Sequence, residues 1–469
     1  MSAQQNVDVV VIGGGLAGMV AANRAAQLGK RVVVLEQGSE ERYLCNSRYT
    51  GGSFHICIRD IMSDEAALTR AITEATGGFV TEKLAQMIAV DGRRSVRWLQ
   101  EEGARFMRAD VASHRGWMLA PPPVVRPGLN WEGRGGDVTL RQLEANLVKR
   151  SGALLRNSRA QTLIMEDGAC HGLVAQQPEG EVRYRASAVV IADGGFPGSL
   201  DMLRQYICPH PEKIKLRNAG TGRGDGLRMA LAAGAGTKGL GSFYGHVLSR
   251  DAMTNDKLWP YPYLDNILHT AIVVGPDGER FVDEGRGGVF VANAIARLPD
   301  PLSSAVILDQ AIWEAGGRQG IIAANPHLPL AGGSTLKADT LADLARQLNI
   351  NATRLEATVA AYNQAIAGNT LKELQPARRT TRYPAQPIVQ APFHAIPTCA
   401  GITNTFGGIA VNEHAQALTE SGAAIAGLYA AGGATGGLEG GPEIGYVGGL
   451  VKCGVTGLRA AEHIASLPS

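Results

Sequence analysis

The chain has 469 residues, of which 45% are hydrophobic and 19% are charged, and its formal net charge at pH 7 is +2. This length is enough for two or three domains with a large core, and the composition is ordinary for a soluble globular protein. The low net charge and the lack of any run of basic residues argue against a nucleic-acid-binding surface.

The cysteines and the apolar runs indicate in which cellular compartment the protein is expected. Six cysteines are scattered without a C-x-x-C pair, which is typical of reduced thiols in a cytosolic protein. No apolar run reaches 18 residues, and the first residues lack the features of a secretory leader. We therefore expect a soluble, cytoplasmic protein without membrane insertion. Neither a haem-attachment motif nor an iron–sulfur spacing occurs, so we predict no metal site.

The first predicted unit is a strand, a helix and a second strand within residues 7–36. Residues 8–12 form a nearly continuous apolar run, as expected for a strand that is buried on both faces of a parallel sheet. Residues 16–28 read as a helix of small residues, and residues 31–35 form the second strand. A strand–helix–strand unit of this kind at the start of a chain is typical of dinucleotide binding.

The turn inside this unit carries the residues that would hold the dinucleotide. Gly13, Gly15 and Gly18 have the G-x-G-x-x-G spacing. The first permits a tight turn, the second lets the backbone approach a pyrophosphate, and the third lets helix and strand pack closely. The helix N-terminus offers free N–H groups to the phosphates. Glu36, at the end of the second strand, can accept hydrogen bonds from the hydroxyls of an adenosine ribose.

The next segments alternate between polar loops, helices and strands. Residues 46–52 (NSRYTGG) are too polar and too rich in glycine for an ordinary core helix. Residues 63–106 are helical by spacing, and residues 137–155 form another amphipathic helix. Residues 160–174 and 182–192 alternate as antiparallel strands.

A second glycine-rich turn follows the last of these strands. The Ala-Asp-Gly-Gly sequence of residues 192–195 marks another point where the backbone swings close to a ligand. Residues 218–226 are again rich in glycine and lead into a helix over residues 227–233. Many of the 60 glycines lie in such turns beside apolar strands, which suits a backbone that passes close to a large planar cofactor.

Residues 238–370 differ in character, and we predict that they form an inserted substrate or capping domain. Aromatic residues and histidines become frequent, a Gly-Pro-Asp-Gly turn at 275–278 indicates a hairpin, and residues 340–367 are helical. Residues 1–237 and 371–469 would then be the two parts of the cofactor-binding domain.

The C-terminal part returns to short strands and glycines. Residues 403–411 form one strand and turn, residues 427–433 form a second apolar strand ending in glycines, and a final helix runs from about 449 to 464. A parallel sheet binds its cofactor at the carboxyl ends of its strands, so these late segments should complete the site that begins at Gly13.

Taken together, the motifs resemble the flavoproteins of the fumarate reductase/succinate dehydrogenase superfamily. VVVIGGGLAGMVAANRAAQLGKRVVVLEQ, NSRYTGG, VVIADGGF, GTGRGDGLRMALAAGA, GERFVDE, TNTFGGIAVN and GLYAAGGATGG occur in the order of that family. The resemblance covers nearly the whole chain, and it is strongest to the soluble single-chain branch with the tricarballylate and 3-ketosteroid dehydrogenases. It implies an α/β fold: a Rossmann-like FAD-binding domain, with a parallel sheet, helices on both faces and antiparallel strands, and an inserted α+β capping domain.

The resemblance also implies which residues contact FAD. Carried over position by position, they are Gly13, Gly15, Leu16, Ala17, Gly18, Glu36, Asn46, Ser47, Thr50, Gly51, Gly52, Ala192, Asp193, Gly194, Gly433 and Gly449. The family attaches FAD covalently through a histidine just before the segment at 46–52. Tyr43, Leu44 and Cys45 occupy that area here, so the resemblance implies non-covalent FAD.

Two departures from the fumarate reductases concern the substrate. Asn404 stands in the segment where those enzymes carry a substrate histidine, and we predict that it contacts substrate. The late segment with their carboxylate-binding arginine reads GGPEIGYVGG over residues 440–449, with Glu443 or Tyr446 near the place of the arginine. Either replacement removes the bidentate guanidinium fork. The Gly-Tyr-x-Gly-Gly segment instead resembles the ketosteroid and tricarballylate branch.

The chemistry implied by the resemblance is transfer of two hydrogens across a C–C bond beside a carbonyl or carboxylate. A base removes the acidic α-proton, and the β-hydrogen leaves as hydride to flavin N5. Tyr446 would polarise the carbonyl, with an N–H of Gly448 or Gly449 as the second donor. The helix that begins near Gly449 would point its positive end at the flavin.

The proton step has several candidates. Arg286 lies just after RFVDE, although the gapless family position of the arginine acid falls on Gly288; the alternative is a solvated loop arginine. His246 stands where the family has a substrate histidine, with Tyr244 two residues away, and the alternative for His246 is a structural role. Tyr49 is a substrate contact or a packing aromatic.

We therefore predict an FAD-dependent dehydrogenase that desaturates the C–C bond alpha,beta to a carbonyl or carboxylate of a small or cyclic substrate. One alternative is the reverse reaction, reduction of an unsaturated carboxylic acid. Another is a non-catalytic flavin-binding protein. The expected partner is a small-molecule substrate, and the sequence leaves the electron acceptor and the oligomeric state open.

Overall fold

The structure, a computed structural model, describes residues 3–108 and 116–468. One of its six-stranded sheets has the strand order β21-β22-β12-β2-β3-β8. β22, β12, β2, β3 and β8 are mutually parallel, and only the edge strand β21 is antiparallel. The strands are β2 (Val9–Ile12), β3 (Val32–Leu35), β8 (Ala153–Leu155), β12 (Ala188–Ile191), β21 (Gln416–Leu418) and β22 (Ala424–Ala430).

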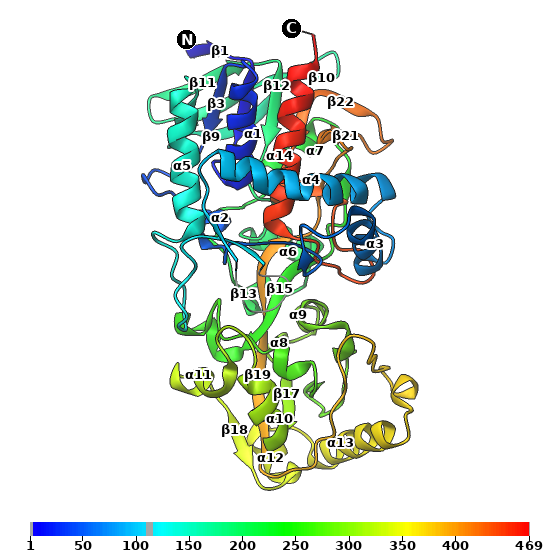
Figure 1. Cartoon of the computed structure of the whole chain (residues 1–469). Coiled ribbons are helices and arrows are strands. Elements are labelled where there is room, and N and C mark those ends of the chain that lie inside the picture. The colour runs from blue at the N-terminus through cyan, green and yellow to red at the C-terminus, as the bar shows by residue number, and fades with distance from the viewer. Residues whose placement is uncertain (1–2, 109–115, 469) are drawn as a thin grey trace.

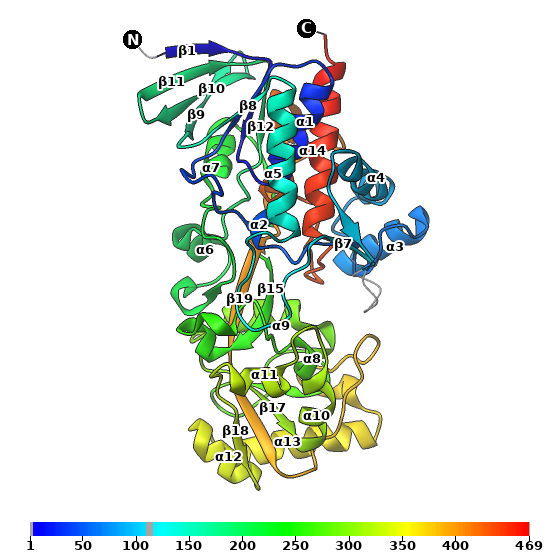
Figure 2. The same cartoon turned by 60° about the vertical axis from the view of Figure 1, so that its left-hand side comes forward.

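Different layers cover the two faces of this sheet. α1 (Leu16–Gln27), α5 (Gly135–Lys149) and α14 (Gly449–Ser466) pack on one face. The other face carries a four-stranded sheet, which Figure 2 shows on the opposite side from the helices. Its strands are β1 (Ala3–Asn6), β9 (Arg159–Glu166), β10 (Ala169–Gln177) and β11 (Gly180–Arg185). The predicted α/β fold class is confirmed, although a sheet rather than helices forms the main cover of the second face.

Further elements surround the cofactor-binding half. The helices are α2 (Asn46–Tyr49), α3 (Glu65–Thr76), α4 (Glu82–Glu101), α6 (Leu200–Tyr206) and α7 (Asp225–Ala232). The short strands are β4 (Ser53–Ile56), β5 (Arg59–Asp60), β6 (Phe106–Met107), β7 (Trp117–Leu119), β14 (Thr237–Lys238), β20 (Gly408–Ala410) and β23 (Thr435–Gly436).

The predicted capping region forms a second body at the far end of the molecule from the two termini (Figure 1). It is built on β19 (Phe393–Thr405), which pairs with β17 and β18 in its first half and with β13 and β15 in its second half. The other elements are β13 (Lys215–Leu216), β15 (Phe243–Ser249), β16 (Ile272–Val274), β17 (Ala305–Asp309), β18 (Leu336–Ala338), α8 (Asp265–Leu268), α9 (Gly288–Ala296), α10 (Gln310–Ala315), α11 (Ala324–Leu330), α12 (Leu341–Leu348) and α13 (Ala352–Ala367). β19 lies beyond residue 370 and yet completes the cap's sheet, so the boundaries 238 and 370 stay predictions.

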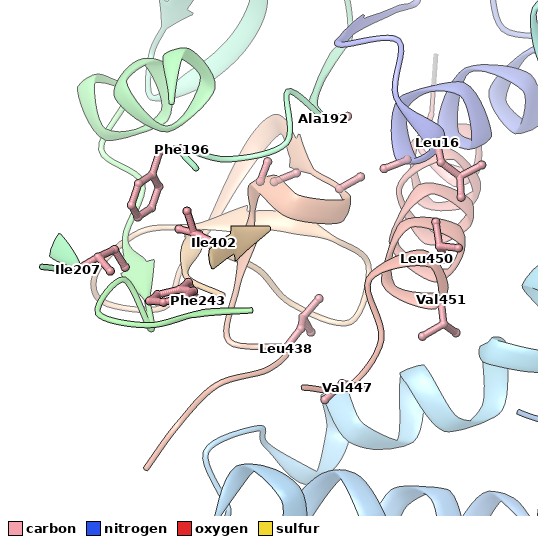
Figure 3. Packing of buried hydrophobic residues seen from close by; sticks show 14 of the residues in the cluster. Leu16, Ala192, Phe196, Ile207, Phe243, Ile402, Leu438, Val447, Leu450 and Val451 are labelled. Atoms are coloured by element: carbon pink, nitrogen blue, oxygen red, sulfur yellow. The ribbon is translucent and has the colours of Figure 1, made fainter. Parts of the chain in front are cut away.

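The hydrophobic core continues from the main sheet to the base of the cap. Figure 3 shows Leu16 at the start of α1 beside Leu450 and Val451 at the start of α14, with Ala192 at the end of β12 nearby. The same cluster includes residues of β15 and β19, such as Ile402. The first turns of two long helices and the end of a central strand are thereby held around one region.

Several predicted ranges differ from the structure. The helix expected over 137–155 ends at Lys149, and residues 153–155 are the edge strand β8; Ser151, with φ +61°, and Gly152 separate the two. The ranges 160–174 and 182–192 each contain parts of two strands, because a turn at Asp167 separates β9 from β10 and β11 ends before β12 begins. Within the described residues, the structure has no helix long and apolar enough to cross a membrane.

Candidate functional site

A cavity of about 570 Å³ lies where the cofactor-binding half meets the cap. Its lining comes from the turn after β2, the first residues of α1, α2 and α14, the turn after β12, and residues of β15 and β19. The volume lies within the range of small-molecule and cofactor sites. Segments that are far apart in the sequence, from residue 12 to residue 453, therefore share one site.

The glycines of the first turn have the geometry that their spacing predicts. Gly13 has φ +98°, and a Cβ there would lie 2.6 Å from the carbonyl oxygen of Ala192. A Cβ at Gly18 would lie 2.0 Å from the carbonyl oxygen of Gly13, so this residue permits the close packing of α1. A Cβ at Gly15 would meet only the Ser47 Oγ, at 3.5 Å, and Gly15 lines the cavity.

Glu36 lies at the end of β3 and lines the same part of the cavity. Its Oε2 accepts from the Gly14 N–H at 2.9 Å and its Oε1 from the Gly38 N–H at 2.8 Å. Burial raises the pKa of Glu36, and the two backbone hydrogen bonds oppose that shift. A carboxylate has about four acceptor positions, so the side chain retains capacity for ligand hydroxyls.

The polar segment at 46–52 connects three parts of the site. Ser47 Oγ accepts from the N–H of Leu16, at the N-terminus of α1, at 2.9 Å. Asn46 donates to the carbonyl oxygen of Thr403 at 3.0 Å and accepts from the N–H of Ala219 at 2.9 Å. Asp193 similarly accepts from the Gly226 N–H at 2.8 Å, which fixes the turn after β12.

Most residues predicted to contact FAD line this cavity. They are Gly13, Gly15, Leu16, Ala17, Glu36, Asn46, Ser47, Thr50, Gly51, Ala192, Asp193, Gly194, Gly433 and Gly449. Gly18 and Gly52 do not line it: Gly18 packs against the turn, and a Cβ at Gly52 would lie 3.2 Å from Leu119.

Two tyrosines, one on β15 and one just before α14, line the cavity side by side. The rings of Tyr244 and Tyr446 stack with centroids 3.8 Å apart and an interplanar angle of 15°. The N–H of Gly449, the first residue of α14, donates to the hydroxyl oxygen of Tyr446 at 2.9 Å. That hydroxyl can therefore donate its own proton to a ligand. Burial raises the pKa of Tyr446 well above its usual value, so the phenol stays protonated at neutral pH.

Tyr244 begins a chain of hydrogen bonds that leads into the cap. Its hydroxyl lies 3.0 Å from Nε2 of His246, and Nδ1 of His246 lies 2.7 Å from Oδ2 of Asp265. Burial lowers the pKa of His246, while the charge of Asp265 opposes that shift. A neutral His246 that donates from Nδ1 to Asp265 accepts at Nε2 from Tyr244, so all three groups are satisfied.

Asp265 occupies a position that only a glycine neighbour allows. Its other carboxylate oxygen accepts from the Val247 N–H at 3.1 Å. A Cβ at Gly288, the first residue of α9, would lie 2.0 Å from Cγ of Asp265. The carboxylate thus lies against the N-terminus of α9, where the helix dipole favours a negative charge.

Arg286 is not among the residues that line the cavity. Its guanidinium forms an ion pair with Glu443 at 3.0 Å, donates to the carbonyl oxygen of Pro442, and lies over the ring of Phe290 with Cζ 3.4 Å from the centroid. Glu443 therefore lies with Arg286, while Tyr446, the other candidate for the place of the family's arginine, lies in the cavity. A proton-transfer role for Arg286 stays a prediction without a contact to support it.

Of the remaining residues predicted to contact substrate, two line the cavity and one does not. Tyr49 and Asn404 line the cavity, and the ring of Tyr49 lies 5.9 Å from that of Trp131. Gly448 does not line it; a Cβ there would lie 2.4 Å from the carbonyl oxygen of His55, so this position permits close backbone packing.

Sequence reasoning missed several residues of the site. His55 lies edge-on to Tyr446 with centroids 5.4 Å apart, and Lys452 lines the cavity with Glu439 as its buried ion-pair partner. Asp265 and Arg217 were also missed. None of these belongs to a spacing motif. They lie on separate elements, His55 on β4, Lys452 on α14 and Asp265 on α8, and Arg217 is brought to the site by the pairing of β13 with β19.

Comparison with known proteins gives a consistent result. The FAD binding domain family matches residues 8–445. The chain is 26% identical over 383 residues to an NADH:acrylate oxidoreductase of Vibrio harveyi, covering 77% of this chain and 35% of that protein. It is 25% identical over 451 residues to an NADH:fumarate oxidoreductase of Klebsiella pneumoniae (strain 342), covering 95% and 46%. The chain thus spans less than half the length of these two curated relatives.

Two other proteins match over most of their length. A 4-oxocyclohexanecarboxylate 2-dehydrogenase of Sinomonas cyclohexanicum is 25% identical over 537 residues, covering 96% of this chain and 90% of that protein. A crystal structure of a 3-ketosteroid-Δ4-(5α)-dehydrogenase of Rhodococcus jostii RHA1 has the same fold, with a TM-score of 0.74 and 22% identity, covering 98% of this chain and 97% of that one.

Proposed function

The chain belongs to the FAD binding domain family, within the superfamily of the fumarate reductase/succinate dehydrogenase flavoproteins, and its cofactor is FAD. From this premise we propose that it is a dehydrogenase that desaturates the C–C bond beside a carbonyl or carboxylate of a small or cyclic substrate. The observation that carries the proposal is the stacked pair of Tyr446 and Tyr244, with His246 behind it, in the same cavity as the dinucleotide-binding turn.

The residues of the cavity suit a dinucleotide. The N-terminus of α1, where Gly15 leaves space beside the backbone, would hold the pyrophosphate, and Glu36 would accept from the ribose. Asn46, Ser47 and Asp193 connect the surrounding turns and would hold the ring end of the cofactor in place. When bound, FAD supplies the acceptor for the hydride that leaves the substrate. Non-covalent attachment is part of the proposal.

Tyr446 would polarise the substrate. Because its hydroxyl oxygen already accepts the N–H of Gly449, its proton is directed to another acceptor, and a substrate carbonyl oxygen in the cavity would be that acceptor. This arrangement alters our expectation that Gly449 donates directly to the substrate: the backbone donor acts through the tyrosine. Withdrawal of electron density from the carbonyl makes the adjacent C–H more acidic.

Tyr244 would take the α-proton. As the substrate proton moves to the Tyr244 oxygen, the phenolic proton moves to Nε2 of His246, and the resulting imidazolium is stabilised by the Asp265 carboxylate at Nδ1. Tyr244 gains one proton and loses one, so it is neutral before and after the step, and His246 holds the proton that the substrate has lost. The reverse sequence would return the proton to the substrate.

Two alternative functions remain. Reduction of an unsaturated acid would use the same groups in reverse, and the oxidoreductases of Klebsiella and Vibrio favour it. That alternative depended on Arg286 as the proton donor, and the ion pair between Arg286 and Glu443 argues against this role. A non-catalytic flavin-binding role does not explain why a buried Tyr–His–Asp chain ends in the cavity.

The test is anaerobic reduction of the bound flavin. The purified holoenzyme would be mixed with a panel of ketones, keto acids and saturated acids, and the visible flavin absorbance would be followed. We expect ketones with an α,β C–H pair to bleach the flavin and yield the unsaturated product. If no compound bleaches it, while chemically reduced enzyme is reoxidised by unsaturated acids, the reductase function replaces the proposed one. A flavin that responds to neither panel would leave only the binding function.

A further inference from the structure

Arg217 is a buried arginine at the cap side of the cavity. It follows β13, and its backbone N–H donates to the carbonyl oxygen of Ile402 on β19 at 2.7 Å. Its side chain lines the cavity together with Tyr244, His246 and Asn404, and the residue is only 9% exposed. The register of β15 and β13 on the two sides of β19 brings these residues together.

The neighbours of Arg217 are uncharged. Nη1 donates to Thr403 Oγ1 at 2.6 Å, Nε donates to the carbonyl oxygen of Pro260 at 3.3 Å, and Cζ lies 5.8 Å from the ring centroid of Tyr261. Within residues 3–108 and 116–468, Nη2 makes no hydrogen bond, and no carboxylate forms an ion pair with this guanidinium. Nη2 is also not among the fully buried atoms that lack a hydrogen-bond partner, so it has accessible surface. Because Arg217 lines the cavity, this open donor is available to a ligand there.

The other buried arginines of the described residues each lie beside a carboxylate. Arg48 forms an ion pair with Asp137, Arg280 pairs with Glu284 at 2.6 Å, and Arg378 lies 3.7 Å from Glu284. All three are no more exposed than Arg217. Burying a cation is costly unless an anion compensates it, so a buried and unpaired guanidinium beside a cavity indicates an anion supplied by a ligand. The planar fork of arginine suits a carboxylate.

We propose that Arg217 binds a carboxylate of the substrate, so that the substrate is a keto acid with its ketone at Tyr446 and its carboxylate at Arg217. The inference rests on the proposed function for the position of the ketone. It also accounts for the missing arginine in the segment 440–449: a guanidinium reaches the cavity from a different element. The aromatic side chains around it, among them Tyr261 and Tyr263, favour a compact ring between the two polar ends.

A binding experiment tests Arg217 without requiring turnover. Cyclohexanecarboxylate and the neutral, nearly isosteric cyclohexanecarboxamide would be titrated into the holoenzyme, and changes in the flavin spectrum would be followed. We expect the wild-type protein to bind the acid more tightly than the amide, by roughly 10- to 100-fold. Equal affinity for acid and amide in the wild-type protein would overturn the proposal, and this comparison needs no variant.

Substitutions then test whether Arg217 causes the preference for the acid over the amide. Arg217→Met should remove the preference for the acid while FAD content and affinity for the amide stay close to wild type. Arg217→Lys, which keeps the charge but loses the fork, should restore part of it. Arg250→Met is the matched control, because this arginine is exposed and its side chain, within the described residues, donates only to the carbonyl oxygen of Leu302. Loss of acid and amide binding alike in Arg217→Met, with FAD content unchanged, would also overturn the proposal.

Reaction with keto acids separates this inference from the proposed function. If 4-oxocyclohexanecarboxylate bleaches the flavin and Arg217→Met slows this reaction far more than that of cyclohexanone, both hold. If the acid binds through Arg217 but no ketone bleaches the flavin, the anion site stands and the dehydrogenase function fails. If Arg217→Met slows both ketones equally, Arg217 serves the reacting groups and the carboxylate assignment is wrong.

Discussion

The hydroxyl of Tyr244 lies 3.0 Å from Nε2 of His246, and the two rings meet edge-on with centroids 5.2 Å apart. Because Nδ1 of His246 faces Asp265, Nε2 is left to accept the phenolic proton. A tyrosine whose pKa burial holds well above its usual value would be a poor base alone. The imidazole behind it supplies the missing basicity.

Replacement of this hydroxyl is the first test. Tyr244→Phe should slow anaerobic flavin reduction by a ketone substrate by about 10²- to 10⁴-fold, which is the usual contribution of one general acid–base group. FAD content should not change, since the ring and its stacking on Tyr446 are retained. Stopped-flow absorbance measures the rate. Tyr206→Phe, whose ring packs on Phe196, is the control and should react at the wild-type rate.

The pH dependence tests the chain behind Tyr244. Burial lowers the pKa of His246 from its ordinary value of 6.5, so the imidazole is neutral at pH 7 and becomes protonated only as the pH falls below that value. Flavin reduction should therefore be constant near neutral pH and decline on the acid side of pH 6.5. Rates measured from pH 4.5 to 8 (about four buffers at constant ionic strength) check this.

Asp265→Asn should change that profile in a defined direction. The carboxylate raises the pKa of His246, so its loss moves the acid limb to lower pH. The plateau rate should also fall by on the order of 10²-fold or more, because the imidazolium is no longer stabilised. Asp300→Asn, an exposed carboxylate paired with Lys213, should leave the profile unchanged. An acid limb that moves upward in Asp265→Asn would argue against the relay.

Gly288→Ala tests the position of Asp265 without changing its charge. The added methyl group would lie 2.0 Å from Cγ of Asp265, so the carboxylate must move away from His246. We expect slower flavin reduction, roughly 10-fold or more, and a lowered thermal midpoint. Gly241→Ala is the control, since the nearest atom to its Cβ would be the Tyr206 carbonyl oxygen at 3.7 Å. A wild-type rate in Gly288→Ala would show that the exact position of Asp265 is unimportant.

How much the sequence predicts depends on whether a feature is local. The turn with Gly13 and the acid at Glu36 follow from spacing within thirty residues, and the structure places both at the cavity. The helix predicted over 137–155 is too long. The spacing of its apolar residues continues into the strand β8, which is defined by its pairing with β3. A short parallel edge strand has no periodicity of its own.

The cap side of the site depends on contacts between distant segments. His246 and Asp265 are separated by 19 positions, and Arg217 reaches the cavity only because β13 pairs with β19, whose residues lie about 185 positions later. For Arg286 the sequence suggested a site residue that the structure does not place in the cavity. Arg286 follows a family motif, but its side chain forms an ion pair with Glu443. Sequence spacing does not determine such pairings.

Tyr446→Phe tests the polarising hydroxyl. Loss of one preorganised donor to a developing oxyanion should slow flavin reduction by about 10²-fold. The N–H of Gly449 would lose its acceptor at 2.9 Å, so it could donate to the substrate directly and rescue part of the rate. A substrate deuterated at the α-carbon should show a larger isotope effect in this variant, because proton removal becomes more rate-limiting. An unchanged rate would remove Tyr446 from the reaction.

Gly15→Ala separates cofactor binding from folding. A Cβ at this position would meet only Ser47 Oγ, at 3.5 Å, which is an ordinary contact, and the backbone of Gly15 has φ −68°. The apoprotein should therefore fold with a nearly unchanged thermal midpoint. FAD affinity should fall by at least about 10-fold, since the methyl group occupies the space through which the backbone approaches the pyrophosphate. Gly275→Ala, in a cap turn with no close backbone contact, is the control for a general effect of the methyl group. If Gly15→Ala retains wild-type FAD affinity, the pyrophosphate does not lie against this turn, and the position of the flavin relative to Tyr446 would have to be reconsidered.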